Sequence, residues 1–313
     1  INPKFAAMNL VTKGCQLIEL ADDMCTVREA PQIVLPQQAD AEGTEFAEHP
    51  FFEAPSLRKA NGRYYLIYSS TQNHELCYAV ADKPQGVYHY GGTIVSNGDI
   101  GLDGRTVPCN YTGTNHGSIV EINGQWYVFY HRQTNQQMCA RQGCAEKIAI
   151  LTDGSIPQVE VTSCGLNDGP LPAIGSYEAR IACNLWGRKG TFPYKLPHHK
   201  ESDYPFFTQT GTDREDNGDQ YIANLRDGSV AGFKYFAFDG SQTTLSINAK
   251  GSAEGSVAVL TDPKEAPIAR IPVHPSENWH TFRCELPAVA GTKALYLRFE
   301  GSGSLDLNTI CFQ

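Results

Sequence analysis

The sequence lacks the features that mark several large classes of protein. It has no uninterrupted apolar stretch of the roughly 18 residues that a membrane-spanning helix requires, and residues 1–3 show neither the basic start nor the apolar core of a signal peptide. It also has no long Lys/Arg cluster, and its net charge of -9 disfavours a partner whose phosphates must be neutralised. We therefore expect neither a membrane nor a nucleic acid as a partner.

The spacing of the cysteines argues against a common type of zinc site. Ten cysteines are spread along the chain, and none has the Cys-x-x-Cys spacing of common zinc sites. We expect mostly free, buried thiols and disfavour zinc, with Cys139 and Cys144 as the best alternative case for a disulfide. Scattered free thiols favour a reducing, cytoplasmic compartment, with an extracellular location as the alternative.

Helical periodicity is nearly absent, whereas short runs of Val, Ile, Leu, Tyr and Phe alternate with Gly, Asn, Asp and Pro turns. This pattern predicts an all-β chain. Residues 56–68 recur at a constant offset as residues 118–130. Each copy has a central Asn-Gly pair between apolar runs, which predicts a hairpin because both turn residues of such a turn take positive φ.

Further strand-like runs extend each hairpin. Residues 76–81 and 88–95 follow the first hairpin, and residues 147–151 and 158–162 follow the second. Four strands in a unit of about sixty residues are typical of a propeller blade. Upstream, residues 16–35 match only the outer half of a blade. Roughly two and a half blades cannot close a ring, so we expect an N-terminal propeller segment or a second chain to complete it.

The segments that lead into the innermost strands are the places where chemistry is expected, because these strands line the channel of a propeller. Phe52 and Glu53 lie in the first segment, and the repeat offset sets Glu53 opposite Asn115 in the second. The preceding phenylalanines would partly desolvate Glu53 and favour the protonated form that a general acid needs. The alternative, with equal weight, is a structural carboxylate paired with Arg58 or Arg141.

Histidines at strand ends are weaker candidates. His116 lies between small residues at the mouth of the second inner strand, where it could bind a metal or hydrogen-bond a catalytic carboxylate. A lone histidine is more often a core residue. We expect His74-Glu75 and His131-Arg132 to make structural hydrogen bonds.

A family resemblance rests on these same segments. Residues 52–56 and 61–66 resemble the segment around the general acid of glycoside hydrolase family 43, and residues 115–119 resemble that family's channel-histidine segment. The resemblance spans about residues 10–165 and takes in three further stretches: residues 74–79, residues 91–95 and Arg141.

The resemblance implies a five-bladed β-propeller that hydrolyses arabinosides, xylosides or related glycans with inversion. Glu53 would be the general acid, and Phe52, Asn115 and Arg141 would line the substrate channel. The resemblance also implies that no cofactor is required, although His116 would hold a central structural calcium ion through water.

One catalytic carboxylate is matched, whereas the family uses an aspartate base and a second aspartate as well. Inversion places the base about 6.5–9.5 Å from the acid. Asp23, Asp99 and Asp103 are predicted in outer turns or loops and are poor substitutes. We therefore expect residues 1–165 to be the C-terminal part of a propeller glycosidase that is inactive alone.

The second half shows no blade repeat. Residues 163–175 are predicted as a Gly/Pro-rich linker, and residues 176–313 as a jelly-roll β-sandwich. Residues 221–225, 232–236 and 303–307 resemble the family 6 type of carbohydrate-binding module. The predicted strands are residues 221–225, 232–238, 244–249, 256–260, 269–273, 279–285, 294–299 and 305–312.

Sugar binding by such a module usually needs exposed aromatic faces. Trp279 is expected in the core, whereas Trp186, Tyr194 and Tyr204 lie in predicted loops and fit either role. Packing against the propeller is thus the favoured role of the sandwich, with sugar binding as the alternative.

Two functions remain open at this point. The first is a glycosidase for arabino- or xylo-configured oligo- or polysaccharides. The second is a non-catalytic glycan-binding or scaffold protein in which Glu53 is a relic.

Overall fold

Strands dominate the protein. A computed structural model describes residues 13–193, 203–211 and 218–313. Within these ranges helical structure is confined to short 3₁₀ turns, which confirms the all-β prediction, and none of them has the length and apolar character that crossing a membrane requires. The turns are Gln38–Asp40, Leu102–Gly104 and Ala179–Ile181.

The chain forms two compact units, and each unit is built from several chain segments. The first unit runs to Asn97 and includes Thr114–His131 and Gly143–Glu160. The second unit consists of Gly98–Gly113, Arg132–Gln142 and Val161–Gln313. Two segments of the predicted propeller region therefore belong to the same unit as the predicted sandwich.

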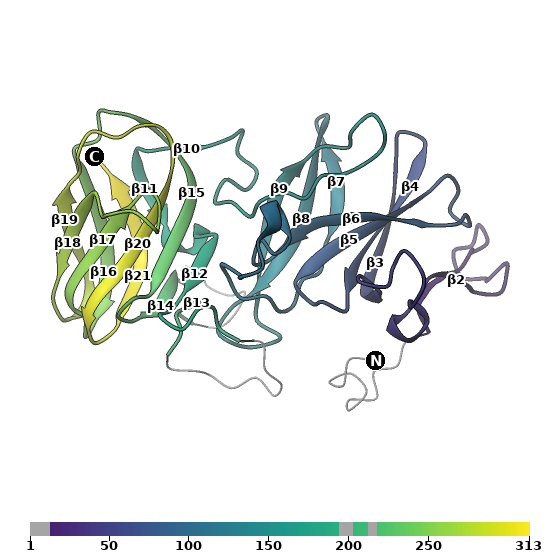
Figure 1. The fold of residues 1–313 in the computed structure, drawn as a ribbon, viewed down its shortest axis with the longest axis horizontal. Coiled ribbons are helices and arrows are strands. Elements are labelled where there is room, and N and C mark those ends of the chain that lie inside the picture. Colours follow the sequence, from purple (N-terminus) through teal and green to yellow (C-terminus); the bar gives the residue numbers. More distant parts are fainter. Residues whose placement is uncertain (1–12, 194–202, 212–217) are drawn as a thin grey trace. The chain divides into compact units, whose positions relative to one another are not determined.

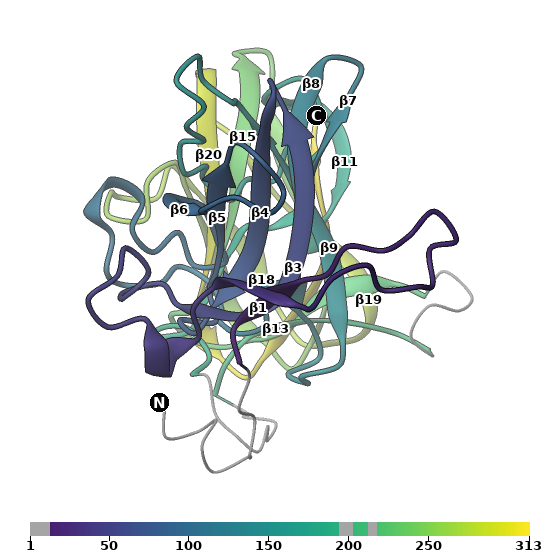
Figure 2. The same cartoon turned by 90° about the vertical axis from the view of Figure 1, so that its right-hand side faces the viewer.

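A four-stranded antiparallel sheet in chain order forms the centre of the first unit (Figure 1). Figure 2 shows its strands β3, β4 and β5 side by side. Asn61 and Gly62, between β3 and β4, have φ values of 48° and 80°, as the hairpin prediction requires. This sheet is the predicted blade. Its strands are β3 (Phe51–Ala60), β4 (Arg63–Ser70), β5 (Glu75–Ala81) and β6 (His89–Ser96).

The second repeat forms a three-stranded sheet of β7 (Ser118–Ile122), β8 (Gln125–Gln133) and β9 (Arg141–Ile148). The predicted fourth strand, residues 158–162, is absent from the described sheet. Val159 instead makes an isolated parallel bridge to Val95 of β6.

Local chemistry explains this difference. Pro157 has no N–H group for a strand ladder, and the N–H group of Ile156 is taken by the hydroxyl of Tyr78 at 2.9 Å. Upstream, β1 (Cys15–Leu17) and β2 (Gln32–Leu35) form the antiparallel pair expected between residues 16 and 35.

The second unit contains two sheets that share one hydrophobic core, as in a jelly-roll sandwich. Every strand predicted after residue 220 is present, and the core contains Phe233, Phe236, Phe299 and Phe312 from both sheets. The first sheet consists of β10 (Leu171–Pro172), β15 (Val230–Asp239), β20 (Ala290–Ser302), β17 (Glu254–Leu260) and β18 (Ala269–Val273), with β12 (Asn184–Trp186) on β15. The second consists of β13 (Phe206–Gln209), β14 (Gln220–Leu225), β21 (Leu305–Phe312), β16 (Thr244–Gly251) and β19 (Ser276–Glu285), with β11 (Gly175–Glu178) on β21.

The stretch predicted as a linker, residues 163–175, is part of this unit. Its β10 pairs in parallel with β15, and the Ser163 N–H donates to the Lys234 carbonyl at 2.5 Å. The segment therefore contributes a strand to the sandwich.

Buried polar contacts hold the segment Gly98–Gly113 within the second unit. Asp99 and the Lys234 ammonium group form an ion pair of 3.3 Å with both side chains almost fully buried. Asp99 also accepts hydrogen bonds from the Cys109 thiol and from the Val161 N–H. Asp99 was predicted in an outer loop, and it is in a loop, but it is buried there.

Contacts of the buried Arg132 side chain hold the segment Arg132–Gln142 within the second unit. Its guanidinium carbon lies 3.7 Å from the centre of the Phe207 ring. The group also donates to the Gln142 side chain and to the carbonyls of Arg180 and Ala182. A planar guanidinium can satisfy several acceptors while it stacks on a ring, which suits this buried position.

All ten cysteines are free thiols, so the alternative of a disulfide between Cys139 and Cys144 is wrong.

Candidate active site

Glu53 lies in an irregular part of β3. The pairing register with β4 shifts on both sides of it, between Phe51 and Glu53 and again between Glu53 and Ser56. Ala54 has a φ of 64°, a left-handed conformation that costs a non-glycine residue about 1–2 kcal/mol. Bulges and strained residues of this kind are common where a strand must re-aim a functional side chain. The sequence repeat did not predict this bulge.

The expected desolvation of Glu53 is wrong for this structure. Phe51 is buried and Phe52 is half-buried, but Glu53 itself is exposed. Among the residues that the structure describes, none forms an ion pair with Glu53. Arg58, proposed as a structural partner, donates to the carbonyls of Leu57 and Ile119 instead.

Ser69 connects Glu53 to Asn115. Ser69 is the β4 partner of Glu53 in the sheet register, and its hydroxyl donates to the Asn115 carbonyl at 2.6 Å. The Asn115 side-chain amide donates to the His74 carbonyl at 3.1 Å. The two repeat-equivalent residues are therefore linked through Ser69, a residue that the sequence reasoning missed. Its position at the end of an apolar strand was the available signal.

Two buried oxygens beside His116 lack a partner. Among the described residues, neither the Thr114 hydroxyl oxygen Oγ1 nor the acceptor Asn115 Oδ1 has a hydrogen-bond partner. Thr114 also has a φ of 61°. Buried polar atoms in native proteins are normally satisfied by protein, water or an ion, so this pair points to a ligand or ordered water at the site.

His116 is exposed, and its ring centre lies 5.7 Å from that of His131. The next residue, Gly117, has no room for a side chain: a Cβ atom there would lie 1.9 Å from the Phe129 carbonyl oxygen and 2.8 Å from the Tyr130 Cα. His116 lies two residues before β7 begins, next to this close approach of two backbones.

The remaining sequence candidates are more dispersed. Arg141 begins β9, is exposed, and donates to the Met138 carbonyl at 2.8 Å. It belongs to the second unit, whereas Glu53 and Asn115 belong to the first. Asp23 and Asp103 are exposed turn residues, as expected, and we assign neither as a catalytic base.

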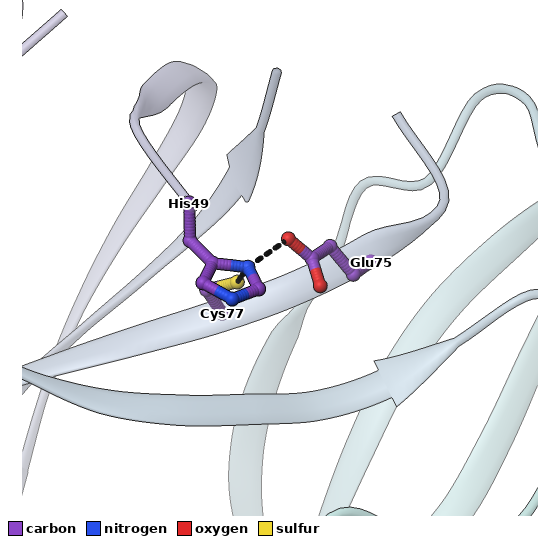
Figure 3. Close-up of side chains that lie close together, drawn as sticks. All are labelled: His49, Glu75 and Cys77. Atoms are coloured by element: carbon purple, nitrogen blue, oxygen red, sulfur yellow. Dashed lines mark hydrogen bonds and ion pairs between the residues drawn. The ribbon is translucent and has the colours of Figure 1, made fainter. Parts of the chain in front are cut away.

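A buried polar cluster lies close to Glu53 in the sequence. His49 Nδ1 and Glu75 Oε1 are 2.6 Å apart, and Glu75 also accepts hydrogen bonds from the Ser70 and Thr93 hydroxyls (Figure 3). Burial alone would raise the pKa of Glu75, but the hydrogen bonds from His49 and Ser70 outweigh it and lower that pKa to about 2. The hydrogen bond to Glu75 raises the pKa of His49.

The structural role expected for His74 and Glu75 is therefore confirmed. His74 Nδ1 lies 3.0 Å from the Ser96 hydroxyl, and burial lowers the pKa of His74. Glu75 organises the end of the sheet that carries Glu53.

Trp279 is not in the core, contrary to expectation. It is half-buried, and its ring centre lies 5.3 Å from that of Tyr221, nearly perpendicular to it. Lys250 Nζ lies 4.5 Å from the Trp279 ring centre and 5.5 Å from that of Tyr221. Phe282 follows Trp279 by three residues in β19, so the two side chains lie on opposite faces of the strand, and Phe282 is the one in the core. The alternation of Trp279 with Phe282 was the signal for this orientation.

Among the described residues, the other aromatic candidates do not form a pair of rings beside a lysine, as Tyr221 and Trp279 do. Trp186 packs against the buried Tyr296, and Tyr204 against Phe192. Tyr194 lies outside the described residues.

Comparison with known families matches two separate stretches of the chain. Residues 12–156 match the family model of Glycosyl hydrolases family 43, and residues 205–313 match that of the Carbohydrate binding module (family 6). The chain therefore resembles a family 43 segment followed by a family 6 module. The resemblance read from residues 52–66 and 115–119 is confirmed.

Curated relatives of this family 43 segment and its module have related names. A "Xylosidase/arabinosidase" of Thermoclostridium stercorarium is 46% identical over 305 residues, which cover 96% of this chain and 64% of the relative. A "Xylosidase/arabinosidase" of Bacteroides ovatus is 35% identical over 118 residues, 37% of this chain and 33% of the relative. The chain thus spans less than two thirds of the length of these relatives.

Among solved structures, a family 43 arabinoxylan arabinofuranohydrolase from Bacillus subtilis, in complex with cellotetraose, aligns with a TM-score of 0.47 and 18% identity. The alignment covers 95% of this chain and 59% of that chain.

Proposed function

We propose that this protein is a glycoside hydrolase for xylo- or arabino-configured glycans and that Glu53 is its general acid. The observation that carries the proposal is the position of Glu53: it is an exposed carboxylate on a bulged strand, and its register partner Ser69 donates a hydrogen bond to the Asn115 carbonyl. The names of the 46% identical relative and of the Bacteroides ovatus relative support the substrate class.

In this mechanism Glu53 protonates the leaving glycosidic oxygen while a second carboxylate activates water on the opposite face of the sugar. The left-handed Ala54 follows Glu53 directly, and a register shift lies on each side of Glu53. Its exposure leaves it accessible to substrate. We assign no base among the described residues.

Hydrolysis of aryl xylosides and arabinofuranosides tests the role of Glu53. The assay uses the full-length protein. We expect Glu53→Gln to slow hydrolysis of substrates with poor leaving groups by about 10²–10⁴-fold, and substrates with activated leaving groups much less, since these need little protonation. Glu121→Gln, an exposed carboxylate of the equivalent strand β7, is the matched control.

Two results would overturn this assignment. Equal rates for Glu53→Gln and the native protein on poor leaving groups remove Glu53 from the mechanism. Glycan binding without any hydrolysis by the native protein favours the alternative of a non-catalytic glycan-binding or scaffold protein.

The proposal also includes a bound calcium ion near His116. The buried, unpartnered oxygens of Thr114 and Asn115 are the hard oxygen ligands that calcium prefers. His116 would contact the ion through water. Bound calcium would supply a fixed positive charge in the channel. Calcium titration by calorimetry should give binding that Asn115→Leu weakens; equal affinity of the variant would contradict the assignment.

Sugar binding by the sandwich is a second candidate function, favoured by Tyr221 and Trp279. Two half-buried rings beside the Lys250 ammonium group combine apolar faces with a hydrogen-bond donor, which suits a sugar. We expect Trp279→Ala and Tyr221→Ala each to weaken retardation in gels containing xylan or arabinan. Tyr64→Ala, a tyrosine of the first unit with Lys59 over its ring, should not.

A further inference from the structure

The cluster of His49, Glu75 and Cys77 has the composition of a metal site. Glu75 and Cys77 lie two residues apart in β5, so both side chains point to the same face of the sheet. His49, from the segment before β3, lies over that face (Figure 3). His49 Nδ1, a Glu75 carboxylate oxygen and Cys77 Sγ all lie within 4.8 Å of one another.

We propose that His49, Glu75 and Cys77 bind a divalent cation of the zinc type, with water in a fourth position. Imidazole, carboxylate and thiolate are the ligands that zinc takes in proteins. The inference does not depend on the proposed glycosidase activity.

The ligand distances allow a tetrahedral site after a small adjustment. Zinc bonds of about 2.0–2.3 Å place neighbouring ligand atoms roughly 3.5 Å apart. His49 Nδ1 lies 2.6 Å from Glu75 Oε1 and 4.0 Å from Cys77 Sγ. The first pair must separate and the second must approach by less than about 1 Å, which rotation of the His49 ring can provide.

Surrounding groups already orient these ligands. The Ser70 and Thr93 hydroxyls donate to Glu75 at 2.5 and 2.8 Å, and the Tyr90 ring stacks on that of His49 at 4.8 Å. Hydrogen-bonded partners of this kind hold the ligands of protein metal sites. The two hydroxyl hydrogen bonds to Glu75 can remain when the ion binds.

The charges of the cluster also allow a divalent ion to replace two protons. Without metal, the raised pKa of His49 and of Cys77 and the lowered pKa of Glu75 favour an imidazolium, a neutral thiol and a carboxylate. The incoming ion takes the place of the His49 Nδ1 proton and the Cys77 thiol proton, so two protons leave and two positive charges enter, while the carboxylate keeps its charge. The half-buried His49 side chain, 29% exposed against 3% for Glu75, gives the ion a route into the cluster.

Cobalt(II) is the probe for the test, because a cobalt–thiolate bond gives a charge-transfer absorption band that oxygen and nitrogen ligands do not. The full chain, freed of metal by a chelator, is titrated with cobalt chloride and then with zinc chloride. We expect a saturable thiolate band at one ion per chain, lost when zinc displaces cobalt.

Variants identify the thiolate. Cys77→Ser should abolish the band, whereas Cys25→Ser and Cys139→Ser, both at exposed positions, should retain it. His49→Gln should keep the band but weaken affinity at least tenfold, and it serves as the second variant if Cys77→Ser does not fold.

Proton release is the independent readout. Below the pKa values of both groups, release of two protons makes the affinity for zinc rise about a hundredfold per pH unit. The other titratable groups around the cluster are Glu48, Tyr68, His74 and Tyr90. A band that survives in Cys77→Ser, absence of any thiolate band at saturation, or affinity independent of pH would each overturn the proposal.

Discussion

The hydroxyl groups of Ser56 and Ser118 lie 2.8 Å apart. These serines occupy the same position in the two copies of the sequence repeat, one in β3 and the other at the start of β7. Equivalent residues meet in this way when successive sheets are arranged around a common axis. The repeat therefore corresponds to a structural repeat of blades and is not a coincidence of composition.

This serine pair should contribute measurably to stability. A double-mutant cycle of Ser56→Ala and Ser118→Ala, measured by urea unfolding, should give a coupling free energy of about 0.5–1.5 kcal/mol, as for a part-buried hydrogen bond. Additive effects of the two substitutions would show that the hydroxyls do not interact in solution.

Gly117 should tolerate no side chain. Gly117→Ala forces a methyl group against the Phe129 carbonyl and the Tyr130 Cα, and we expect a loss of about 3 kcal/mol or more in the free energy of unfolding. Gly143→Ala, where an added Cβ meets no atom within 4 Å, is the control and should change stability little. Similar midpoints for both variants in thermal unfolding would contradict the packing at Gly117.

The ion pair of His49 and Glu75 should make the stability of the metal-free chain depend on pH. The pKa of Glu75 is about 2 in the folded chain, below its ordinary value of about 4.3, so its contribution is present above pH 4.3 and is lost as pH falls toward 2. The pKa of His49 is raised, so its contribution is present below its ordinary pKa of about 6.5 and is lost as pH rises through the folded value. The pair thus stabilises most between about pH 4.5 and 6.5.

Chemical denaturation at a series of pH values checks this dependence. From pH 5 to pH 2 the Glu75 carboxylate should account for a loss of about 2–3 kcal/mol. Glu75→Gln should be less stable at pH 5 and should lack this part of the loss. If the native chain and the variant lose stability in parallel, Glu75 is not the group responsible.

Removal of one partner of the buried ion pair in the second unit should be costly. Asp99→Asn removes the carboxylate that lies 3.3 Å from the buried Lys234 ammonium group, and we expect a loss of about 3–5 kcal/mol in unfolding free energy. Asp103→Asn is the control, because Asp103 is exposed and has a similar φ of 50°. The double variant with Lys234→Met should recover part of the loss; no recovery would mean that the cost lies in the backbone around Asp99.

The regular parts of the fold could be predicted from sequence because they depend on local patterns. The two Asn-Gly turns and the strands after residue 220 follow from turn chemistry and alternation alone. The short strands β10 to β13 could not be predicted in this way, since pairing with β14, β15 and β21 creates them from segments without a strand pattern.

The candidate site could be predicted only in part. The repeat offset set Glu53 and Asn115 at equivalent positions, whereas the bulge at Ala54 and the exposure of Glu53 depend on how β3 pairs with β4. The cluster of His49, Glu75 and Cys77 was missed for a similar reason, because its ligands come from two elements and show no ligand spacing along the chain.

The division of the second unit among three chain segments has an evolutionary consequence. Gly98–Gly113 and Arg132–Gln142 belong to it although they lie within the family 43 region of the chain. A recombination event near residue 163 would transfer the sandwich strands but leave behind the partners of Lys234 and Phe207. The two regions are therefore expected to be inherited together, as one genetic unit, and not exchanged as separate cassettes.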